Sequence, residues 1–274
     1  MKFINIVLVL FLISGLARSS ENNIRSGNPK KGICLTTKSE LWFKKVESLN
    51  VSWHYSWGEQ LKPEEPKGVE FVPMIWSAHA DTASVDKKLQ NISSLYTDKK
   101  IRYMLGFNEP DGKKQANMSV DNALDYWPRL QKLNIPLGSP ACVHPDNEWM
   151  KEFMHKADSL NYRVDFICVH WYGGPNAKAF LNYLQKVYDL YHKPIWITEF
   201  AVADWKAKTA EENKFSKAEI LDFMKEILPA LNKSQYVERY AWFSASESSA
   251  ALGNSALFDS KGNLTELGKC YQSF

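Results

Sequence analysis

The 274-residue sequence predicts an α/β fold, namely a single (β/α)8 TIM barrel. Three observations support this: short apolar runs are bounded by turn residues, helix-period segments fill most gaps between them, and the length is close to the ~250 residues of such barrels. The sequence shows no internal repeat, low-complexity tract or linker, so we expect one domain. The eight expected strands are 32–36, 51–57, 71–76, 101–108, 136–142, 164–172, 194–200 and 237–244.

Helix signals lie between several of these runs. Asp146 is expected to cap a helix that buries Trp149, Phe153 and Ala157. The segment 177–192 places its apolar residues on one face and ends before a proline. Ser216 and Glu219 form the pattern of a capping box, which predicts a helix that ends at Leu228. The segment 58–70, rich in proline and glutamate, is expected to be an irregular loop.

An open, doubly wound sheet is the main alternative fold. Such a sheet usually carries a glycine-rich nucleotide loop after its first strand, and the segment 32–37 contains none. The nearest candidate for a phosphate loop, 106–114, has the wrong glycine spacing and lacks Ser or Thr after the lysine. A closed barrel is therefore the preferred prediction.

The N-terminus has the form of a secretory signal peptide. Lys2 precedes an almost continuously apolar run, 3–13, which is followed by small residues. We therefore expect a signal peptide at 1–19, a short extension at 20–31 and the barrel domain at 32–274. The C-terminus carries no hydrophobic tail, so no membrane anchor is expected, and the predicted location is secreted or extracellular, with cell-wall association left open.

The charge balance bears on the class of partner. The formal net charge is +3, and it becomes +1 once Lys2 and Arg18 leave with the signal peptide. A nearly neutral protein of this kind is not suited to nucleic acid, and we expect a neutral substrate and a monomeric protein.

Four widely spaced cysteines are present, at positions 34, 142, 168 and 270. The spacing excludes a short zinc knuckle and permits three disulfide connectivities. Cys34 lies on the first expected strand and Cys270 in the last expected helix, and these elements are neighbours in a closed barrel. We favour that pair, with four buried free thiols as the alternative.

Two glutamates mark the candidate catalytic site. The run 101–108 ends in Asn108 and Glu109 and is stopped by Pro110, and the run 194–200 carries Glu199 at a matching place. If these runs are the fourth and seventh strands of one barrel, both carboxylates face its mouth. Two carboxylates and an amide suit acid catalysis on a sugar. The negative charge of Glu199 would keep Glu109 protonated until the sugar esterifies Glu199. A salt bridge from each glutamate to a loop lysine is the structural alternative.

The ends of the expected strands are rich in aromatic residues. A sugar ring packs its apolar face against an aromatic plane, which makes these residues candidates for substrate binding. Any single tryptophan is equally consistent with core packing, but the set is not. The strand-end aromatics are Trp53, Tyr55 and Trp57 on the second strand, Trp76 on the third, Trp171 and Tyr172 on the sixth, and Trp242 and Phe243 on the eighth.

Other polar residues receive supporting roles. Asn108 is expected to bind the sugar 2-hydroxyl, while His170 and Tyr172 are expected to orient Glu199, with a core histidine as the alternative for His170. Neither a metal-binding His pattern nor the G-x-S-x-G motif of serine hydrolases is present, so we expect no metal and no cofactor. Asp111, Asp146, Asp204 and Glu247 are interpreted as caps or rim contacts.

Four motifs in order, GFNEPD, DFICVHWYGG, PIWITEFA followed by Trp205, and LFDSKGNLTELGKCY, resemble glycoside hydrolase family 128 of clan A. The resemblance covers the chain from about residue 32 to its end. It implies a retaining β-1,3-glucanase in which Glu109 is the acid/base and Glu199 the nucleophile, and in which Trp205 contacts the substrate. Endo or exo action stays open.

Two rival functions remain at this point. Another clan A specificity, for β-1,4-glucan, mannan or xylan, is compatible with the same two carboxylates. A non-catalytic glucan-binding protein of the cell wall would keep the aromatic residues but does not need both glutamates. A retaining enzyme predicts carboxyl groups about 5 to 5.5 Å apart.

Overall fold

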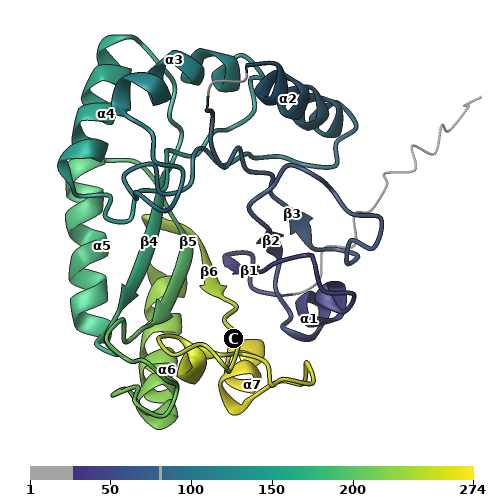
Figure 1. The fold of residues 1–274 in the computed structure, drawn as a ribbon, viewed down its shortest axis with the longest axis vertical. Coiled ribbons are helices and arrows are strands. Elements are labelled where there is room, and N and C mark those ends of the chain that lie inside the picture. Colours follow the sequence, from purple (N-terminus) through teal and green to yellow (C-terminus); the bar gives the residue numbers. More distant parts are fainter. Residues whose placement is uncertain (1–26, 80–81) are drawn as a thin grey trace, which may run out of the picture.

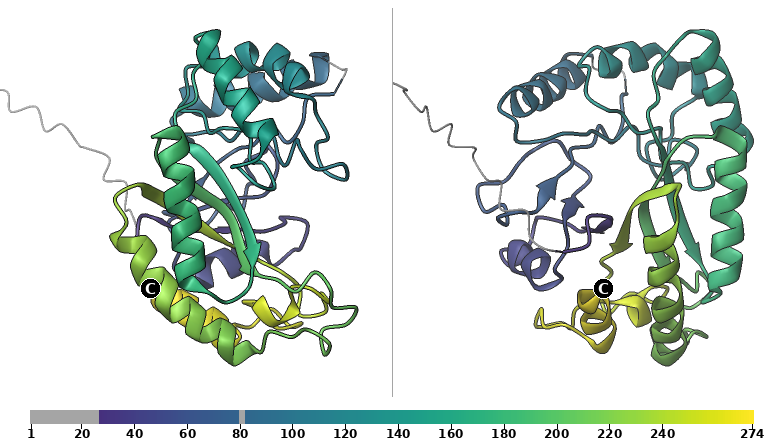
Figure 2. Two further views of the ribbon diagram at one scale, coloured as in Figure 1. Left: turned by 90° about the vertical axis from the view of Figure 1, so that its left-hand side faces the viewer. Right: turned by 180° about the vertical axis from the view of Figure 1, so that it is seen from behind.

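The computed structural model describes residues 27–79 and 82–274. The expected signal peptide, 1–19, and most of the expected extension lie outside the described residues. The helices lie around the outside of the strands, and the views from the side and from behind show the same arrangement (Figure 1, Figure 2). None of the helices in the described part of the chain combines the length and the hydropathy that a membrane span requires.

Six strands form one parallel sheet in the order β3-β2-β1-β6-β5-β4. They are β1 (Lys31–Cys34), β2 (Trp53–Tyr55), β3 (Glu70–Phe71), β4 (Ile167–Gly173), β5 (Ile195–Val202) and β6 (Val237–Phe243). All pairs are parallel, and β1 pairs with both β2 and β6, so the first and last strands of the sequence are neighbours. The α/β fold with parallel strands and surrounding helices is confirmed.

The fourth and fifth expected strands, 101–108 and 136–142, are not continuous strands. They make isolated parallel bridges instead, which join Met74 to Leu105, Met104 to Leu137 and Gly138 to Phe166. These bridges span the opening between β3 and β4, so strand contacts continue around the barrel although the ladder of hydrogen bonds is interrupted there. Added Cβ atoms at Gly106 and Gly138 would approach neighbouring atoms to 2.9 Å and 2.5 Å, which shows how closely this part of the barrel is packed.

The seven α-helices of the described residues mostly begin at residues that cap them. They are α1 (Trp42–Ser48), α2 (Thr82–Thr97), α3 (Val120–Gln131), α4 (Glu148–Ser159), α5 (Ala177–Tyr191), α6 (Lys217–Lys233) and α7 (Glu266–Ser273), with a short 3-10 helix η1 (Gly253–Ser255). The capping box of Ser216 and Glu219 is confirmed at the start of α6. The segment 56–69 is a loop, as expected.

The start of α4 and the end of α6 differ from the prediction, and the contacts explain both differences. Asn147, not Asp146, caps α4 by accepting a hydrogen bond from the Met150 N–H. Asp146 instead accepts hydrogen bonds from Tyr183 and Lys186 of α5. Helix α6 continues past the expected end at Leu228 and through Pro229, because buried apolar residues on both sides of the proline keep the helix packed against the core.

The core consists of two hydrophobic clusters. The larger one lies between the strands and the helices. The smaller one contains no helix residue and fills the inside of the barrel, with Trp53, Tyr55, Cys168 and Trp196 among its members. Inward and outward side chains therefore belong to different layers, and one residue of shift along a strand moves a side chain from one layer to the other.

The expected Cys34–Cys270 disulfide is wrong, since all four cysteines are free thiols. The layers explain why: Cys34 belongs to the cluster inside the barrel, whereas Cys270 packs from helix α7 against the outer cluster. The strand wall lies between the two thiols. Adjacency of the two elements in the fold was therefore not sufficient to bring their sulfur atoms together.

Candidate active site

Glu199 reaches the barrel mouth through a β-bulge. On β4, Val169 pairs with Ile197 and His170 pairs with Glu199, which leaves Thr198 as an extra residue on β5. The pairing of β5 with β6 shifts at the same place. Trp196 points inward, so strict alternation would turn Glu199 outward. The extra residue re-aims Glu199 into the site.

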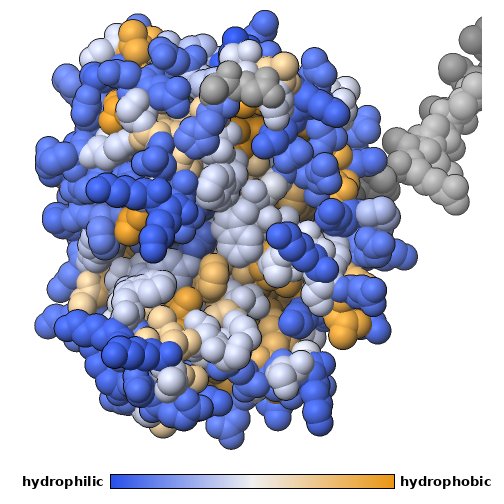
Figure 3. Space-filling model, viewed as in Figure 1, coloured by the Kyte–Doolittle hydropathy of each residue, from blue (hydrophilic) through white to orange (hydrophobic). Residues whose placement is uncertain are grey.

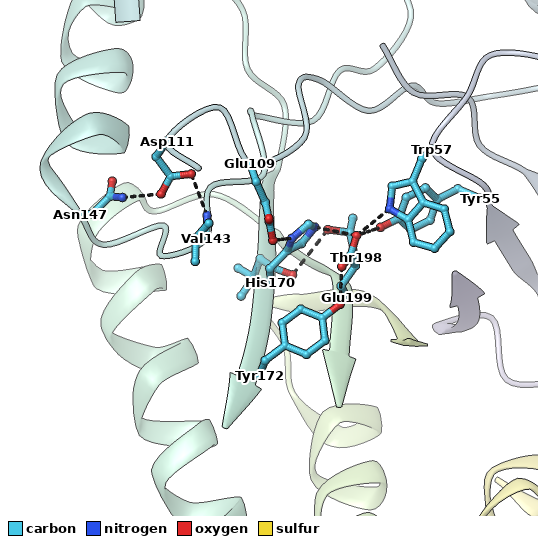
Figure 4. A network of polar contacts seen from close by, with 11 residues as sticks. Tyr55, Trp57, Glu109, Asp111, Val143, Asn147, His170, Tyr172, Thr198 and Glu199 are labelled. Atoms are coloured by element: carbon cyan, nitrogen blue, oxygen red, sulfur yellow. Dashed lines mark hydrogen bonds and ion pairs between the residues drawn. The ribbon is translucent and has the colours of Figure 1, made fainter. Parts of the chain in front are cut away.

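Three donors hold the Glu199 carboxylate, as Figure 4 shows. Oε1 accepts hydrogen bonds from the Tyr55 hydroxyl at 2.9 Å and from the Trp57 indole N–H at 2.7 Å. Oε2 accepts a short hydrogen bond from the Tyr172 hydroxyl. Only 5% of Glu199 is exposed, so these three bonds replace the water that an ionised carboxylate needs.

The two tyrosines act as donors because they stay protonated. Burial raises the pKa of Tyr55 and of Tyr172 well above the ordinary value, and the negative charge of Glu199 raises both further. A phenol that does not ionise keeps its O–H and donates it to the carboxylate. Three fixed donors therefore hold the Glu199 carboxylate in one position.

Glu109 sits in a strained backbone conformation. Its φ is 42°, in the left-handed region that non-glycine residues rarely adopt, and Pro110 follows it directly. Two backbone hydrogen bonds hold the turn, from the Glu109 N–H to the Ala141 carbonyl at 2.7 Å and from the Gly112 N–H to the Glu109 carbonyl at 2.9 Å. Such strain costs about 1–3 kcal/mol and persists where the surroundings enforce it, which is common at functional sites.

His170 lies between the two glutamates. Its Nδ1 is 2.9 Å from Glu109 Oε1, and its Nε2 is 3.4 Å from Glu199 Oε1 (Figure 4). Burial alone would disfavour the imidazolium, but the charge of Glu199 and the hydrogen bond to Glu109 outweigh it and raise the pKa of His170 above its ordinary value. The histidine thus connects the two carboxyl groups that the sequence analysis selected.

The two carboxylates are close enough to act on one sugar. One atom from each of Glu109, His170 and Glu199 lies within 4.8 Å of the others. One oxygen of Glu109 and one of Glu199 thus lie no more than 4.8 Å apart, which fits the short separation of retaining enzymes, about 5 to 5.5 Å, better than the longer separation of inverting ones. The same spacing would also admit a metal ion, but the Glu199 oxygens already accept three hydrogen bonds.

The glutamates open into a cleft of about 630 Å³. The face that Figure 3 shows is mostly hydrophilic at its edge and carries residues of intermediate hydropathy near its centre. Trp76, Asn108, Tyr172 and Trp205 line the cleft as expected from the sequence, and 65% of Trp205 is exposed beside the Tyr172 ring. The Asn108 side chain is buried, and its Oδ1 accepts no hydrogen bond from the part of the chain that the structure describes, which leaves an acceptor for a ligand hydroxyl.

The expected binding residues Tyr55, Trp53 and Trp242 do not line the cleft, and Tyr55 is buried as a donor to Glu199. Trp53 is fully buried inside the barrel below Tyr55, where its indole donates to the Lys30 carbonyl. Trp242 is fully buried in the outer cluster, against Phe200. Trp53 points inward but lies too deep, and Trp242 points outward because its neighbours Ala241 and Phe243 face the inside.

Several cleft residues were missed by the sequence analysis. Trp57, one of the strand-end aromatics, lies beyond the end of β2 with a left-handed φ of 58° and lines the cleft as a donor to Glu199. Strand alternation could not have indicated its role as a donor, because the strand ends at Tyr55 and the backbone turns at Trp57. The missed residues follow strand ends or belong to loops: Gln115, Val143, His144 and Leu252.

Asp111 connects the Glu109 turn to the next loop. One oxygen accepts a hydrogen bond from the Val143 N–H at 2.9 Å, and the other accepts one from the Asn147 side chain at 2.7 Å (Figure 4). Val143 and His144 line the cleft, so Asp111 holds their loop in place. Asp204 and Glu247 also bind backbone N–H groups of loops, which matches their interpretation as caps and rim contacts.

Comparison with known proteins gives solved structures that share this fold. A subgroup I endo-β-1,3-glucanase of glycoside hydrolase family 128 from Amycolatopsis mediterranei, a variant in complex with laminarihexaose, is 36% identical, with a TM-score of 0.76 over 89% of this chain and 99% of that one. A subgroup II endo-β-1,3-glucanase from Sorangium cellulosum is 27% identical, with a TM-score of 0.73, over 89% of this chain and 98% of that one. A subgroup III curdlan-specific exo-β-1,3-glucanase from Blastomyces gilchristii in complex with glucose is also 27% identical, with a TM-score of 0.70, over 90% of this chain and 99% of that one.

A curated relative and a family model agree with these structures. Alkali-sensitive linkage protein 1 of Schizosaccharomyces pombe is 31% identical over 257 residues, which are 89% of this chain and 44% of that protein. The chain thus spans less than half the length of that relative. The model of the glycosyl hydrolase catalytic core matches residues 32–271. The resemblance seen in the sequence is confirmed, and the chain belongs to the family of the glycosyl hydrolase catalytic core.

Proposed function

We propose that the protein is a retaining glycoside hydrolase that cleaves β-1,3-glucan. The observation that carries the proposal is the pair of carboxylates, Glu109 and Glu199, which lie within reach of one sugar ring at the bottom of an aromatic cleft. The names of the similar solved proteins support β-1,3-glucan as the substrate.

The mechanism follows from the surroundings of each glutamate. Glu199, ionised and held by three donors, attacks the anomeric carbon of the sugar. Glu109 gives a proton to the departing glycosidic oxygen as that bond breaks, which leaves a sugar ester on Glu199. Glu109, now ionised, takes a proton from a water molecule that displaces Glu199 from the sugar. Each of the two displacements inverts the anomeric carbon, so the product keeps the configuration of the substrate.

The cleft residues receive roles in binding. Asn108 Oδ1 is an unpaired buried acceptor beside Glu109 and would bind the 2-hydroxyl of the reacting sugar. Trp57, Trp76 and Trp205 present aromatic planes along the cleft, and the Trp57 indole N–H is used to hold Glu199. We favour endo action, because the subgroup I endo-enzyme is more similar in sequence than the exo-enzyme.

We further propose that 32–274 form one monomeric catalytic domain and that 1–19 are removed on secretion. N-terminal sequencing of the exported protein and its elution volume in gel filtration test these statements.

The test of the function is product analysis on laminarin. A mixture of laminari-oligosaccharides early in the reaction supports an endo-β-1,3-glucanase, whereas glucose alone indicates exo action. A parallel panel of β-1,4-glucan, mannan and xylan tests the other clan A specificities. Absence of hydrolysis on every polysaccharide, with binding to laminarin retained, would favour a glucan-binding protein instead.

A further inference from the structure

His170 is unusually placed for a structural histidine. Only 1% of the residue is exposed, and both of its nitrogen atoms face carboxylates from other parts of the chain. Nδ1 makes a hydrogen-bonding contact with Glu109, while Nε2 makes no hydrogen bond within the described residues and lies 3.4 Å from Glu199 Oε1. A buried imidazole that uses one nitrogen and leaves the other unpaired has a role that core packing does not explain.

The two carboxylates depend on His170 to different degrees. Glu199 already accepts hydrogen bonds from Tyr55, Trp57 and Tyr172, so its position does not require the histidine. Within the described residues, His170 is the side chain that hydrogen-bonds the carboxylate of Glu109. Loss of the imidazole would therefore change Glu109 far more than Glu199.

The charged groups around the ring all favour an imidazolium. Glu199 faces it from β5 and Asp111 from the turn after the bridged segment 101–108; Glu109 adds its own charge once it has given up its proton. Tyr172 on its own strand and Tyr55 on β2 donate to Glu199, and both stay neutral because burial raises the pKa of each phenol. Among the described residues, the charges that act on His170 are those of carboxylates, and they raise its pKa against the effect of burial.

We propose, on the basis of the function proposed above, that His170 is a positioning residue that acts through Glu109 as a buried imidazolium. Its Nδ1–H donates to Glu109 Oε1, which leaves the other oxygen of Glu109 to carry the proton for the departing sugar. Once that proton has moved to the glycosidic oxygen, Glu109 is an anion. The imidazolium then provides its counter-charge, while Glu199 has become a neutral ester.

The kinetic test compares two substrates and two variants. An activated aryl β-glycoside of laminaribiose does not need a proton on its leaving group, whereas laminarin does. We expect His170→Asn, which keeps an N–H near the position of Nδ1 but no charge, to lower kcat/KM on laminarin about 10- to 100-fold and on the aryl glycoside less than about 3-fold.

Tyr172→Phe is the matched control for the opposite carboxylate. It removes a donor to Glu199, so it should lower kcat/KM on both substrates by a similar factor. His155→Asn, at an exposed position on α4, controls for the substitution itself. If His170→Asn affects both substrates equally, as Tyr172→Phe does, His170 acts through Glu199 and the inference is wrong.

A direct measurement keeps the inference testable even if the variant is unstable. Nitrogen-15 NMR of wild-type protein labelled at histidine should show both ring nitrogens of His170 protonated at about pH 6. Glu199→Gln removes a nearby negative charge and should lower the His170 pKa. A single protonated nitrogen under these conditions would overturn the proposal. An inactive wild-type enzyme with a charged His170 would instead contradict the proposed function alone.

Discussion

The two catalytic glutamates lie in contrasting surroundings. Glu199 belongs to a continuous strand, is almost fully buried and accepts three hydrogen bonds. Glu109 follows a segment that is joined to the barrel by isolated bridges and has a left-handed backbone, and among the described residues its carboxylate makes one side-chain hydrogen bond, with His170. The first carboxylate is thus held by its partners and the second by its backbone.

This difference matches the two chemical tasks. A nucleophile must stay ionised and keep one position, and several fixed donors achieve both. An acid/base residue must lose and regain a proton in each cycle, so numerous fixed donors would favour one protonation state and oppose the other. Hydrogen bonds from side chains therefore fix Glu199, whereas backbone hydrogen bonds fix the turn that contains Glu109.

The largest expected effect comes from Glu199→Gln. Because the amide cannot form the sugar ester, we expect kcat to fall by at least about 10⁴-fold on laminarin and on the aryl glycoside alike. Glu226→Gln, at an exposed position on α6, should leave both rates unchanged. Substantial turnover by Glu199→Gln on either substrate would show that Glu199 is not the nucleophile.

Glu109→Ala should separate the two substrates. We expect hydrolysis of laminarin to fall about 10²- to 10⁴-fold, since the leaving oxygen is no longer protonated, while kcat/KM for the aryl glycoside is largely kept. Added azide should then trap the sugar ester and release a glycosyl azide. A loss of equal size on both substrates would contradict the assignment of Glu109 as acid.

A smaller effect is expected when Glu199 loses one of its donors. Tyr172→Phe and Trp57→Phe each remove one hydrogen bond to a charged group, worth about 1.5–3 kcal/mol. We expect kcat on laminarin to fall about 10- to 150-fold, with the melting temperature little changed. Unchanged kcat in both variants would show that the donors around Glu199 do not set its reactivity.

The smallest effect concerns metal ions. Glu109, His170 and Glu199 have the spacing of a metal site, but their contacts with one another and with the three donors account for the arrangement. Dialysis against EDTA should therefore leave the rate on laminarin unchanged. A loss of activity that zinc or magnesium restores would show that the cluster works as a metal centre.

The fold and the two glutamates could be predicted from the sequence because apolar runs and strand ends are local features. The depth and direction of single side chains could not, because they depend on register. Trp242 was expected in the cleft but faces the outer cluster, because the inward positions on its strand are one residue away. Trp53 faces inward as expected but lies below the cleft, inside the barrel. The inward direction of Glu199 depends on Thr198 as a bulge, which no pattern in the sequence indicates.

Long-range partners were the other limit. The contact of His170 with Glu109 joins residues 61 positions apart, and the donor Trp57 reaches across 142 positions to Glu199. The sequence analysis expected His170 to orient Glu199, whereas its hydrogen bond is to the other glutamate. Residue types at strand ends identify the members of a site, but the pairs within it emerge only when the barrel closes.

The stereochemistry of the first product tests double displacement by Glu109 and Glu199 most directly. Proton NMR during the first minutes of laminarihexaose hydrolysis should show new reducing ends as the β-anomer, which later converts to the equilibrium mixture. Initial release of the α-anomer would show inversion, and it would contradict the assignment of Glu199 as a nucleophile.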